Sequence, residues 1–427
     1  MRKRLPRPSS GGEGASSGTG ASSGAPAPPL VVRERPSGGG SAPAGFVPFH
    51  RPSIGADEID AVVAVLRSGW LTTGGRVLEL ERAFAERLGV PHAVAVSSCT
   101  AALHLALSAA GVGPGDEVIV PTFTFTATAE AVCYVGARPV LADVDPVDGL
   151  LRASEVERRL GPRTRAVVPV HLAGLPCDLD AIGEALAGTG AVLIDDAAHA
   201  LPARLRGRPI GAIGDATAFS FYATKNLTTA EGGMITTSRA DWAEAMRRRR
   251  LHGMSRDAWR RYAADGRWAY DVTELGWKYN LPDVLAAIGL AQLPRLDAFH
   301  DARRDIAARY RAGLGDIDAL ELPAERPGTE SAWHLFIVRL ALERLRLDRA
   351  GVAEALRARG VGTSVHFIPL HRHSHWARLG GASADAFPGA ERLFARCLSL
   401  PIYPDLRPDE VDRVIAAVRG VLTEARR

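Results

Sequence analysis

The sequence contains little lysine and few cysteines, and it has no long apolar run. Only three of its 52 basic residues are lysines (Lys3, Lys225 and Lys278), and the others are arginines. The four cysteines lie far apart, without the short paired spacing of zinc sites or small disulfide frameworks, which fits a reducing cytoplasm. No stretch of 18 apolar residues occurs, and no signal peptide is recognisable. We therefore expect a cytoplasmic protein with no metal site and no membrane span.

The net charge of +4 does not indicate a nucleic-acid-binding protein, because the excess lies in one segment. Residues 1–45 contain six basic and two acidic residues, so the rest of the chain balances at 46 of each. This segment is rich in Gly, Ser, Pro and Ala and poor in large apolar side chains, a composition typical of disorder. We predict a disordered tail over residues 1–45, and we expect a protein shortened to begin near Ala44 to keep its activity.

Beyond the tail, amphipathic helices alternate with short apolar strands. Strands are predicted at residues 92–98, 116–126, 137–144, 165–172, 191–197 and 216–221, and helices at 55–69, 75–89, 100–111, 152–161 and 178–188. Strands that are apolar on both faces and are separated by helices indicate an α/β fold with a mainly parallel sheet. The pattern changes after about residue 310. We predict a large domain over 46–305 and a smaller α+β domain over 306–427.

Polar residues follow the first and fifth of these strands. Residues 98–101 (Ser-Cys-Thr-Ala) begin a helix, where backbone N–H groups and a hydroxyl suit a phosphate, although an ordinary helix cap has the same composition. Asp195 and Asp196 end an apolar strand, and buried carboxylates need partners. One interpretation is structural, with Asp196 capping a helix and Asp195 in a salt bridge. The other is a carboxylate that faces a protonated heterocyclic nitrogen.

Ser220 ends the next strand, and Lys225 follows five residues later. A lysine that forms an imine must lose its proton near neutral pH, which arginine cannot do. This requirement would retain a lysine in an arginine-rich chain, although Lys225 taken alone could be a chance survivor. A phosphate site, an aromatic strand end ("TFTF"), an aspartate, a serine and a lysine together describe a site for pyridoxal phosphate.

Eight blocks of the sequence occur in an order that is familiar from one family. They are "GWLTTGGRVLELERAF", "SSCTAALHLAL", "GDEVIVPTFTFTATAEAV", "PVHLAGLPCDLDAI", "IDDAAHA", "FSFYATKNLTTAEGGMI", "LGWKYNLPDVLAAIGLAQL" and "GVGTSVHFIPLH". From about Phe49 to the C-terminus, the sequence resembles the DegT/DnrJ/EryC1/StrS sugar aminotransferases, which are fold-type I pyridoxal-phosphate enzymes. "GWKYNLPD", "AWHLFIVRL", "GVGTSVHF" and "SLPIYPDL" are similar to the branch that aminates UDP-4-keto-arabinose.

The resemblance implies a large domain with a seven-stranded type of sheet, and it implies roles for matching residues. Lys225 would hold the cofactor covalently and then move the proton between substrate and cofactor carbons. Asp196 would pair with the pyridinium nitrogen, and Phe125 would stack on the ring. His199 stands where many relatives have Gln, and we expect it near the phenolic oxygen.

Three residues, Thr100, Ala101 and Ser220, would hold the phosphate. Because the family places its active sites at a dimer interface, Asn280 or Lys278 would reach the phosphate site of a partner subunit. Many relatives have Asn-Tyr-Arg where this sequence has Lys278-Tyr279-Asn280, so both residues stay candidates. We expect His366 to approach the substrate from the small domain of the partner.

Other signals have structural interpretations. His371, His373 and His375 alternate in a Pro-containing loop, which is typical of exposed histidines rather than of a zinc site. The run of arginines at 247–250 favours a solvated helix face with acidic neighbours over a nucleic-acid patch. Arginines and aromatic residues at 252–268 could bind a nucleotide diphosphate or form a loop without a ligand.

We therefore expect a homodimeric aminotransferase that moves an amino group from glutamate, leaving 2-oxoglutarate, to a nucleotide-linked keto sugar of the UDP-4-keto-pentose type. The same chemistry on a dTDP- or GDP-keto-hexose or on a keto-cyclitol is the nearest alternative, and the loop at 252–272 would decide between them. A related sugar dehydratase would carry His in place of Lys225. A non-catalytic regulatory protein that binds the cofactor would be expected to lose Lys225, Asp196 or Ser220, and all three are present.

Overall fold

The computed structural model describes residues 45–255, 270–323, 325–380 and 383–427. The expected tail therefore lies outside the described residues, apart from Gly45. Residues 43–427 form one compact unit. Among the helices of the described residues, none is both long enough and apolar enough to span a membrane.

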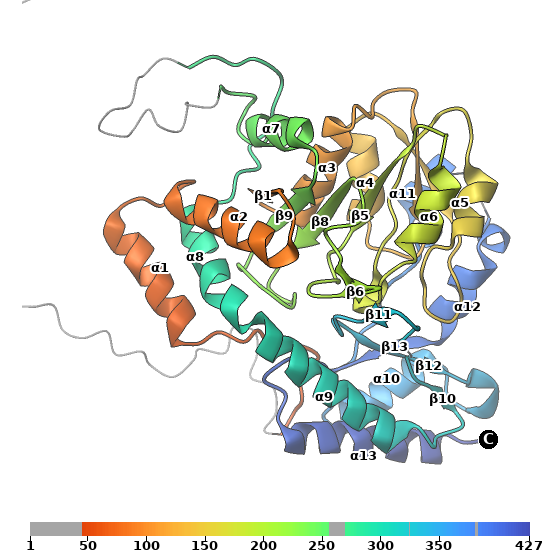
Figure 1. Cartoon of the computed structure of the whole chain (residues 1–427). Helices are drawn as coiled ribbons and strands as arrows, with labels where there is room; N and C mark the ends of the chain where they lie inside the picture. Colours follow the sequence, from red (N-terminus) through yellow and green to blue (C-terminus); the bar gives the residue numbers. More distant parts are fainter. Residues whose placement is uncertain (1–44, 256–269, 324, 381–382) are drawn as a thin grey trace, which may run out of the picture. The chain divides into compact units, whose positions relative to one another are not determined.

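A seven-stranded sheet lies at the centre of this unit, with strand order β1-β9-β8-β5-β4-β2-β3 (Figure 1). Its strands are β1 (His92–Val96), β2 (Glu117–Pro121), β3 (Arg138–Ala142), β4 (Thr164–Val167), β5 (Val192–Asp196), β8 (Ala216–Ser220) and β9 (Gly233–Thr237). Strand β9 runs antiparallel to β1 and β8, and the pairs from β8 through β5, β4 and β2 to β3 are parallel. The predicted mainly parallel sheet is confirmed, but sequence analysis did not identify β9.

Both faces of this sheet are buried. The helices before and between its strands are α1 (Ala56–Ser68), α2 (Gly75–Leu88), α3 (Cys99–Ala109), α4 (Ala127–Tyr134), α5 (Ala153–Arg159) and α6 (Leu179–Leu186), and α7 (Ala240–Arg249) and α8 (Asp283–Gln292) follow. Alternate residues of one strand enter different cores: Ile119 belongs to the core cluster that includes Phe84 of α2, whereas Val118 and Val120 belong to the cluster that includes Leu103 of α3. Burial on both faces explains why the strands are continuous apolar runs.

The predicted helix ends have identifiable causes. Helix α1 ends at Gly69, whose φ of 74° is the left-handed conformation that glycine adopts without steric cost. The N-terminus of α2 is capped from α8, because the Asp283 carboxylate accepts the backbone N–H groups of Gly74 and Val77 at 2.8 and 3.0 Å. A carboxylate at this end also interacts favourably with the helix dipole.

The C-terminal part of the unit contains a second sheet and its own apolar core. The sheet has the order β10 (Leu320–Glu321), β12 (Phe336–Leu340) and β13 (Cys397–Leu400). The helices of this part of the chain are α9 (Leu296–Leu314), α10 (Arg349–Ala358), α11 (Ser374–Gly380), α12 (Pro388–Arg396) and α13 (Pro408–Glu424), of which α11 packs on the large sheet through Trp376. A small third sheet joins β11 (Thr329–Glu330) to β6 (Arg204–Leu205) and β7 (Arg208–Pro209). The expected domain boundary near residue 305 falls within α9, and the division into domains stays a prediction.

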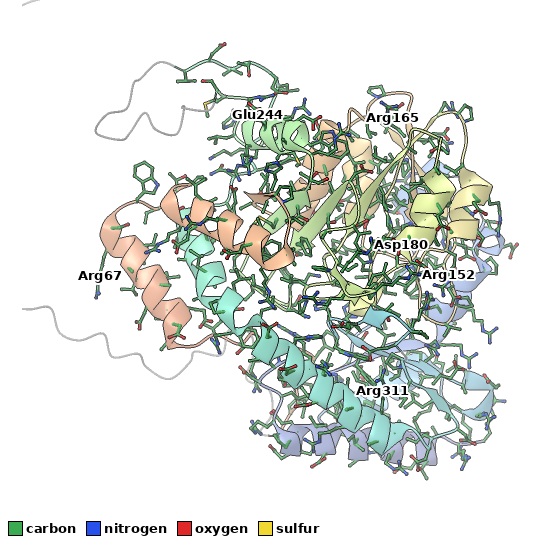
Figure 2. The ribbon with its side chains drawn as sticks, in the orientation of Figure 1. Arg67, Arg152, Arg165, Asp180, Glu244 and Arg311 are labelled. Atoms are coloured by element: carbon green, nitrogen blue, oxygen red, sulfur yellow. The ribbon has the colours of Figure 1, made fainter. Side chains whose placement is uncertain are left out.

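The arginine run at the end of α7 differs from the prediction of a solvated face. Arg248 does pair with Glu244, which is labelled in Figure 2, at 3.2 Å. Arg250, however, is buried and bonds to the buried carboxylate of Glu81 and, at 2.7 Å, to the carbonyl of Ala95. The prediction is therefore wrong for Arg250, because its guanidinium neutralises a carboxylate beneath the helix rather than facing water.

Candidate active site

A cavity of about 390 Å³ lies at the carboxyl ends of β5 and β8, the edge where open α/β sheets bind ligands. Its walls come from the start of α3, the segment after β2, the ends of β5 and β8, and two C-terminal segments. It brings together seven of the ten candidate residues: Thr100, Phe125, Asp196, His199, Ser220, Lys225 and His366. The other three, Ala101, Lys278 and Asn280, are not among its lining residues.

Asp196 is the last residue of β5, and three donors surround its carboxylate. Thr128 Oγ1 donates to Oδ2 at 2.8 Å, the Ala198 N–H donates to Oδ1 at 3.1 Å, and the Cys99 thiol lies 3.9 Å from Oδ1. Burial raises the pKa of Asp196, while the bond from Thr128 and the charge of Lys225 act in the opposite direction. A positively charged group in the cavity would offset the remaining cost of burying this carboxylate.

Asp195 belongs to the other face of the sheet. Thr217 Oγ1 donates to its Oδ2 at 3.0 Å, and its Oδ1 has no hydrogen-bond partner among the described residues. Burial raises the pKa of Asp195 to about 7, and the neighbouring Asp215 acts in the same direction. The salt bridge considered for Asp195 is absent from the described ion pairs, because successive residues of β5 alternate between faces and this one enters the apolar core.

Lys225 occupies a turn after β8, and its backbone N–H donates to the carbonyl of Tyr222 at 2.9 Å. Burial lowers the pKa of the Lys225 ammonium from 10.5 to about 8, although the nearby Cys99 and Asp196 raise it. With that pKa, about a tenth of the amine is uncharged at pH 7. The position therefore provides the nucleophilic amine that an imine-forming lysine requires.

Helix α3 begins at the cavity wall. Ser98 caps it, since its Oγ accepts the N–H of Ala101 at 3.1 Å. The N–H groups of Cys99 and Thr100 precede the intrahelical ladder and have no partner within the described part of the chain. They are the donors that an anion at this helix end would use. The candidate Ala101 differs from Thr100, because its N–H is already bonded to the cap.

A glycine allows this helix end to approach the sheet. At Gly233, the first residue of β9, an added Cβ would lie 2.6 Å from the carbonyl carbon of Ser98. Any other residue would therefore move the start of α3 away from the cavity. Ser220, which pairs with Gly233 in the sheet, lines the same cavity and supplies a hydroxyl. The two N–H groups and this hydroxyl fit the phosphate of a cofactor.

Aromatic rings form another wall. Phe125 is 60% exposed, and its ring centroid lies 6.0 Å from that of Phe367. The buried His199 stacks on Phe367 at 5.8 Å, and its Nδ1 accepts the N–H of Ala173 at 3.3 Å. Burial lowers the pKa of His199 well below 6.5, so its ring is neutral and the hydrogen is on Nε2. The exposed ring of Phe125 can stack on a heterocycle, and His199 can donate to an oxygen.

His366 lines the cavity of its own chain, which corrects the expectation that it would enter a partner's site. Its Nδ1 lies 2.9 Å from Ser399 Oγ on β13, and its ring stacks on Phe49 at 5.4 Å. The segment then returns to the large sheet, because the N–H of Leu370 donates to the carbonyl of Thr122 at 2.7 Å. The sequence did not predict that this segment returns to the large sheet, since Leu370 and Thr122 are about 250 positions apart in the chain.

The three alternating histidines also differ from one another. His373 and His375 are exposed as expected, but His371 is buried. The Nδ1 of His371 lies 2.7 Å from Thr122 Oγ1, and its Nε2 lies 2.7 Å from Glu391 Oε1. His371 therefore fastens its segment to the large sheet. The described residues contain no group of three or more His, Cys, Asp or Glu that could hold a metal.

Lys278 and Asn280 lie elsewhere. Asn280 Nδ2 donates to Thr73 Oγ1 at 2.7 Å, and Lys278 Nζ donates to Asn280 Oδ1. Asn280 lines a separate cavity of about 320 Å³ together with Thr73 and Arg250. The structure thus does not bring these two residues to the Lys225 of their own chain.

Three residues of the site were not identified from sequence: Thr128, Asn226 and His334. Thr128 gave no signal, because only the packing of α4 against β5 brings it to Asp196. Asn226 is the neighbour of Lys225, and its amide contacts a segment more than a hundred residues away. His334 could have been identified, because a histidine inside the apolar run "AWHLF" is expected to be buried and hydrogen-bonded.

Comparisons with known proteins identify the family of this chain. The DegT/DnrJ/EryC1/StrS aminotransferase family profile matches residues 52–419. The spore coat polysaccharide biosynthesis protein SpsC of Bacillus subtilis is 45% identical over 381 residues, which cover 89% of this chain and 98% of SpsC.

Two solved structures show the same fold. The aminotransferase TlmJ from Streptoalloteichus hindustanus superposes with a TM-score of 0.81 at 38% identity, covering 89% of this chain and 99% of TlmJ. Spr1654 from Streptococcus pneumoniae, assigned as a sugar aminotransferase and solved in its PLP form, gives 0.83 at 33% identity, with 89% and 99% coverage.

Proposed function

Since the chain belongs to the DegT/DnrJ/EryC1/StrS aminotransferase family and is a pyridoxal-phosphate-dependent sugar aminotransferase, we propose that it moves an amino group from glutamate to a nucleotide-linked 4-keto-pentose. The observation that carries this proposal is one cavity that holds both Lys225, with its pKa lowered to about 8, and the buried carboxylate of Asp196. A lysine able to lose its proton and a buried acid are the two groups this chemistry needs.

The residues around the cavity fit the cofactor. The N–H groups of Cys99 and Thr100 and the hydroxyl of Ser220 would hold its phosphate, and the Asp196 carboxylate would hold its ring nitrogen. Phe125 would cover one face of the ring. When bound, pyridoxal phosphate supplies an electron sink for the proton transfers and carries the amino group between the two half-reactions.

Lys225 moves protons in both half-reactions. With the cofactor bound, its Nζ would accept the proton lost by the carbon that bears the donor's amino group and would give a proton to the cofactor carbon that receives this group, and the transfers would run in the opposite direction with the sugar. The Asp196 carboxylate, fixed by Thr128 and the N–H of Ala198, would stay ionised beside a protonated ring nitrogen of the cofactor. His199, whose Nε2 carries the hydrogen, would donate to the phenolic oxygen of the cofactor.

An absorbance titration tests this proposal. The spectrum of the bound cofactor should change when glutamate is added and return when a UDP-4-keto-pentose follows. The Lys225→Ala protein, which keeps the rest of the cavity, should show neither change. A wild-type protein that binds the cofactor but responds to no amino donor would contradict the proposal.

The choice of sugar and nucleotide is expected to depend on one loop. The loop expected to choose between a UDP-pentose, a dTDP- or GDP-hexose and a cyclitol spans 252–272, and its residues 256–269 lie outside the described residues. The name of SpsC refers to polysaccharide biosynthesis, which supports a sugar acceptor in general. Competition between the three substrate classes for the amino-loaded enzyme, measured as relative kcat/KM, would rank them.

We also propose that the enzyme is a homodimer in which Asn280 or Lys278 reaches the phosphate site of the partner. Both side chains lie outside the cavity of their own chain, which supports this arrangement. Mixing the inactive Lys225→Ala protein with an Asn280→Ala protein tests it. An equal mixture should regain up to about a quarter of wild-type activity, because about half of its dimers would be mixed and each mixed dimer would contain one site with both intact residues. If mixing restores nothing while Asn280→Ala is inactive, Asn280 acts within its own chain.

A further inference from the structure

The side chain of Asn226, the residue after Lys225, has a fixed orientation. Its Nδ2 donates to the carbonyl oxygens of Leu201 and Ala332 at 3.0 and 2.7 Å. Two acceptors at one end of the amide identify that end as the NH₂ group. The other end, Oδ1, can only accept a hydrogen bond. It lies 3.0 Å from Nδ1 of His334, so the His334 ring must carry its hydrogen on Nδ1.

The second ring nitrogen of His334 is then an acceptor. His334 is buried, and burial lowers its pKa well below 6.5, so the ring is neutral. The ring lines the Lys225 cavity. Within the described residues, the Nε2 of His334 has no hydrogen-bond partner. It is also not one of the fully buried polar atoms without a partner, so it stays accessible from the cavity. An acceptor without a partner therefore borders the space where the substrate binds.

The neighbouring His199 has the opposite arrangement. Its Nδ1 accepts the N–H of Ala173, so its Nε2 carries the hydrogen. The two rings lie 4.4 Å apart with an angle of 35° between their planes. Side by side in one cavity, His199 thus offers a donor and His334 offers an acceptor, and backbone and amide contacts outside the cavity fix both.

We infer that His334 is a specificity-determining residue whose Nε2 accepts a hydrogen bond from a sugar hydroxyl next to the reacting ketone carbon. The inference rests on the proposed function. A carboxylate, a phosphate or the ketone oxygen presents only lone pairs and would be disfavoured against Nε2. A hydroxyl can donate, and it would also satisfy an acceptor that is costly to leave unpaired once the substrate excludes water.

A matched pair of substrates tests the inference in the full-length enzyme with bound cofactor. One is a UDP-4-keto-pentose with a hydroxyl beside the ketone, and the other is its deoxy analogue at that carbon. The wild type should prefer the hydroxylated sugar by about 10–100-fold in kcat/KM. In His334→Leu the preference should fall to about threefold or less, because only the hydroxylated substrate loses a partner. His334→Gln, which offers an amide oxygen, should restore part of the preference.

The half-reaction with glutamate is the internal control. A general effect of His334→Leu on the site would change this rate, followed by absorbance, and the rates with both sugars by the same factor, so the ratio between the two sugars is the quantity to compare. His373→Leu, at an exposed histidine outside the cavity, should change each rate by less than about threefold. A preference that survives in His334→Leu, an equal loss with both sugars, or a loss confined to the glutamate step would overturn the inference. If His334→Leu does not fold, the His334→Gln protein decides. A folded Gln variant whose rates with both sugars are unchanged, or are lost to the same extent, overturns the inference.

Calorimetric binding of the two sugars separates this inference from the proposed function. A wild-type protein that binds the hydroxylated sugar more tightly, and loses that difference in His334→Leu, supports the role of His334 even if glutamate gives no reaction. In that case only the proposed function fails. A wild type without any preference in binding or turnover overturns the inference itself.

Discussion

The two faces of the central sheet surround neighbouring carboxylates in different ways. On the cavity side, Asp196 accepts hydrogen bonds from Thr128 and from a backbone N–H, and the ammonium of Lys225 is close enough to lower its pKa. On the opposite side, Asp195 has one hydroxyl partner, Thr217, and an oxygen without any partner in the described part of the chain. Burial raises the pKa of both carboxylates.

The difference shows that burial alone does not make a functional carboxylate. Asp196 has donors that act against the rise in its pKa and an open side for a cationic ligand, whereas Asp195 is enclosed by apolar core and has a pKa of about 7. A group with that pKa takes up a proton during folding at neutral pH rather than holding a charge for a ligand. The cavity side should therefore control activity, and the core side should control stability.

The largest effect is expected from the cavity side at Lys225. Lys225→Arg keeps a positive charge beside Asp196 but cannot lose its proton. We expect kcat to fall by about 10⁴-fold, in the range that a lost general base produces. Cofactor affinity should fall less, because the phosphate and ring-nitrogen contacts remain. Steady-state kinetics and a cofactor titration measure the two quantities. More than a tenth of wild-type activity in this variant would contradict the assignment.

Asn substitutions at the two aspartates compare the faces directly. Asp196→Asn removes the charge that would stabilise the ring nitrogen, so kcat should fall by about 10²–10³-fold, as for other lost electrostatic contacts in active sites. Asp195→Asn should change kcat by less than about threefold, because Asp195 does not line the cavity. The comparison would be broken if both variants lost activity to the same extent.

Much of this arrangement could be predicted from sequence, because it follows the order of the strand ends. Asp196, Ser220 and Lys225 each follow an apolar strand, and parallel strands bring their carboxyl ends to one edge. The two helices before the first strand were predicted for a similar reason, since their apolar periodicity and terminal glycines act locally. The residues that perform the chemistry are therefore the easiest to recognise.

The residues that orient these groups could not be predicted. Asn226 bonds to Ala332, and His366 returns to the cavity of its own chain, through contacts more than a hundred positions apart. Arg250 is buried because Glu81 lies beneath it, not because of anything in the arginine run. A single sequence contains no information on such pairings, whose energies depend on distances that only the folded chain defines.

The core side should affect the dependence of stability on pH. The folded pKa of Asp195 is about 7 and its ordinary value is 3.8, so the native state holds an extra proton between these values. The stability that this proton provides is complete below pH 4 and is lost as the pH rises through 7, by up to about 4 kcal/mol. Asp195→Asn should remove this slope. Urea unfolding of the wild type and of Asp195→Asn at pH 5 and pH 8 measures this slope. If the two proteins differ in free energy of unfolding by the same amount at both pH values, the raised pKa of Asp195 is contradicted.

The smallest effects are expected from the hydroxyls that serve the two carboxylates, and Val substitutions, which keep the side-chain shape, separate them. Thr217→Val removes the hydroxyl that donates to Asp195, which should cost about 1 kcal/mol of stability at pH 8, where the carboxylate is ionised, and should leave kcat unchanged. Thr128→Val removes a bond of similar length from Asp196, but the charge there supports the reaction, so kcat should fall about tenfold. Chemical unfolding and steady-state kinetics on both variants measure the two quantities. If both variants lost the same fraction of kcat, Thr217 would affect the reaction through Asp195. The proposed separation between a cavity side that controls activity and a core side that controls stability would then be wrong.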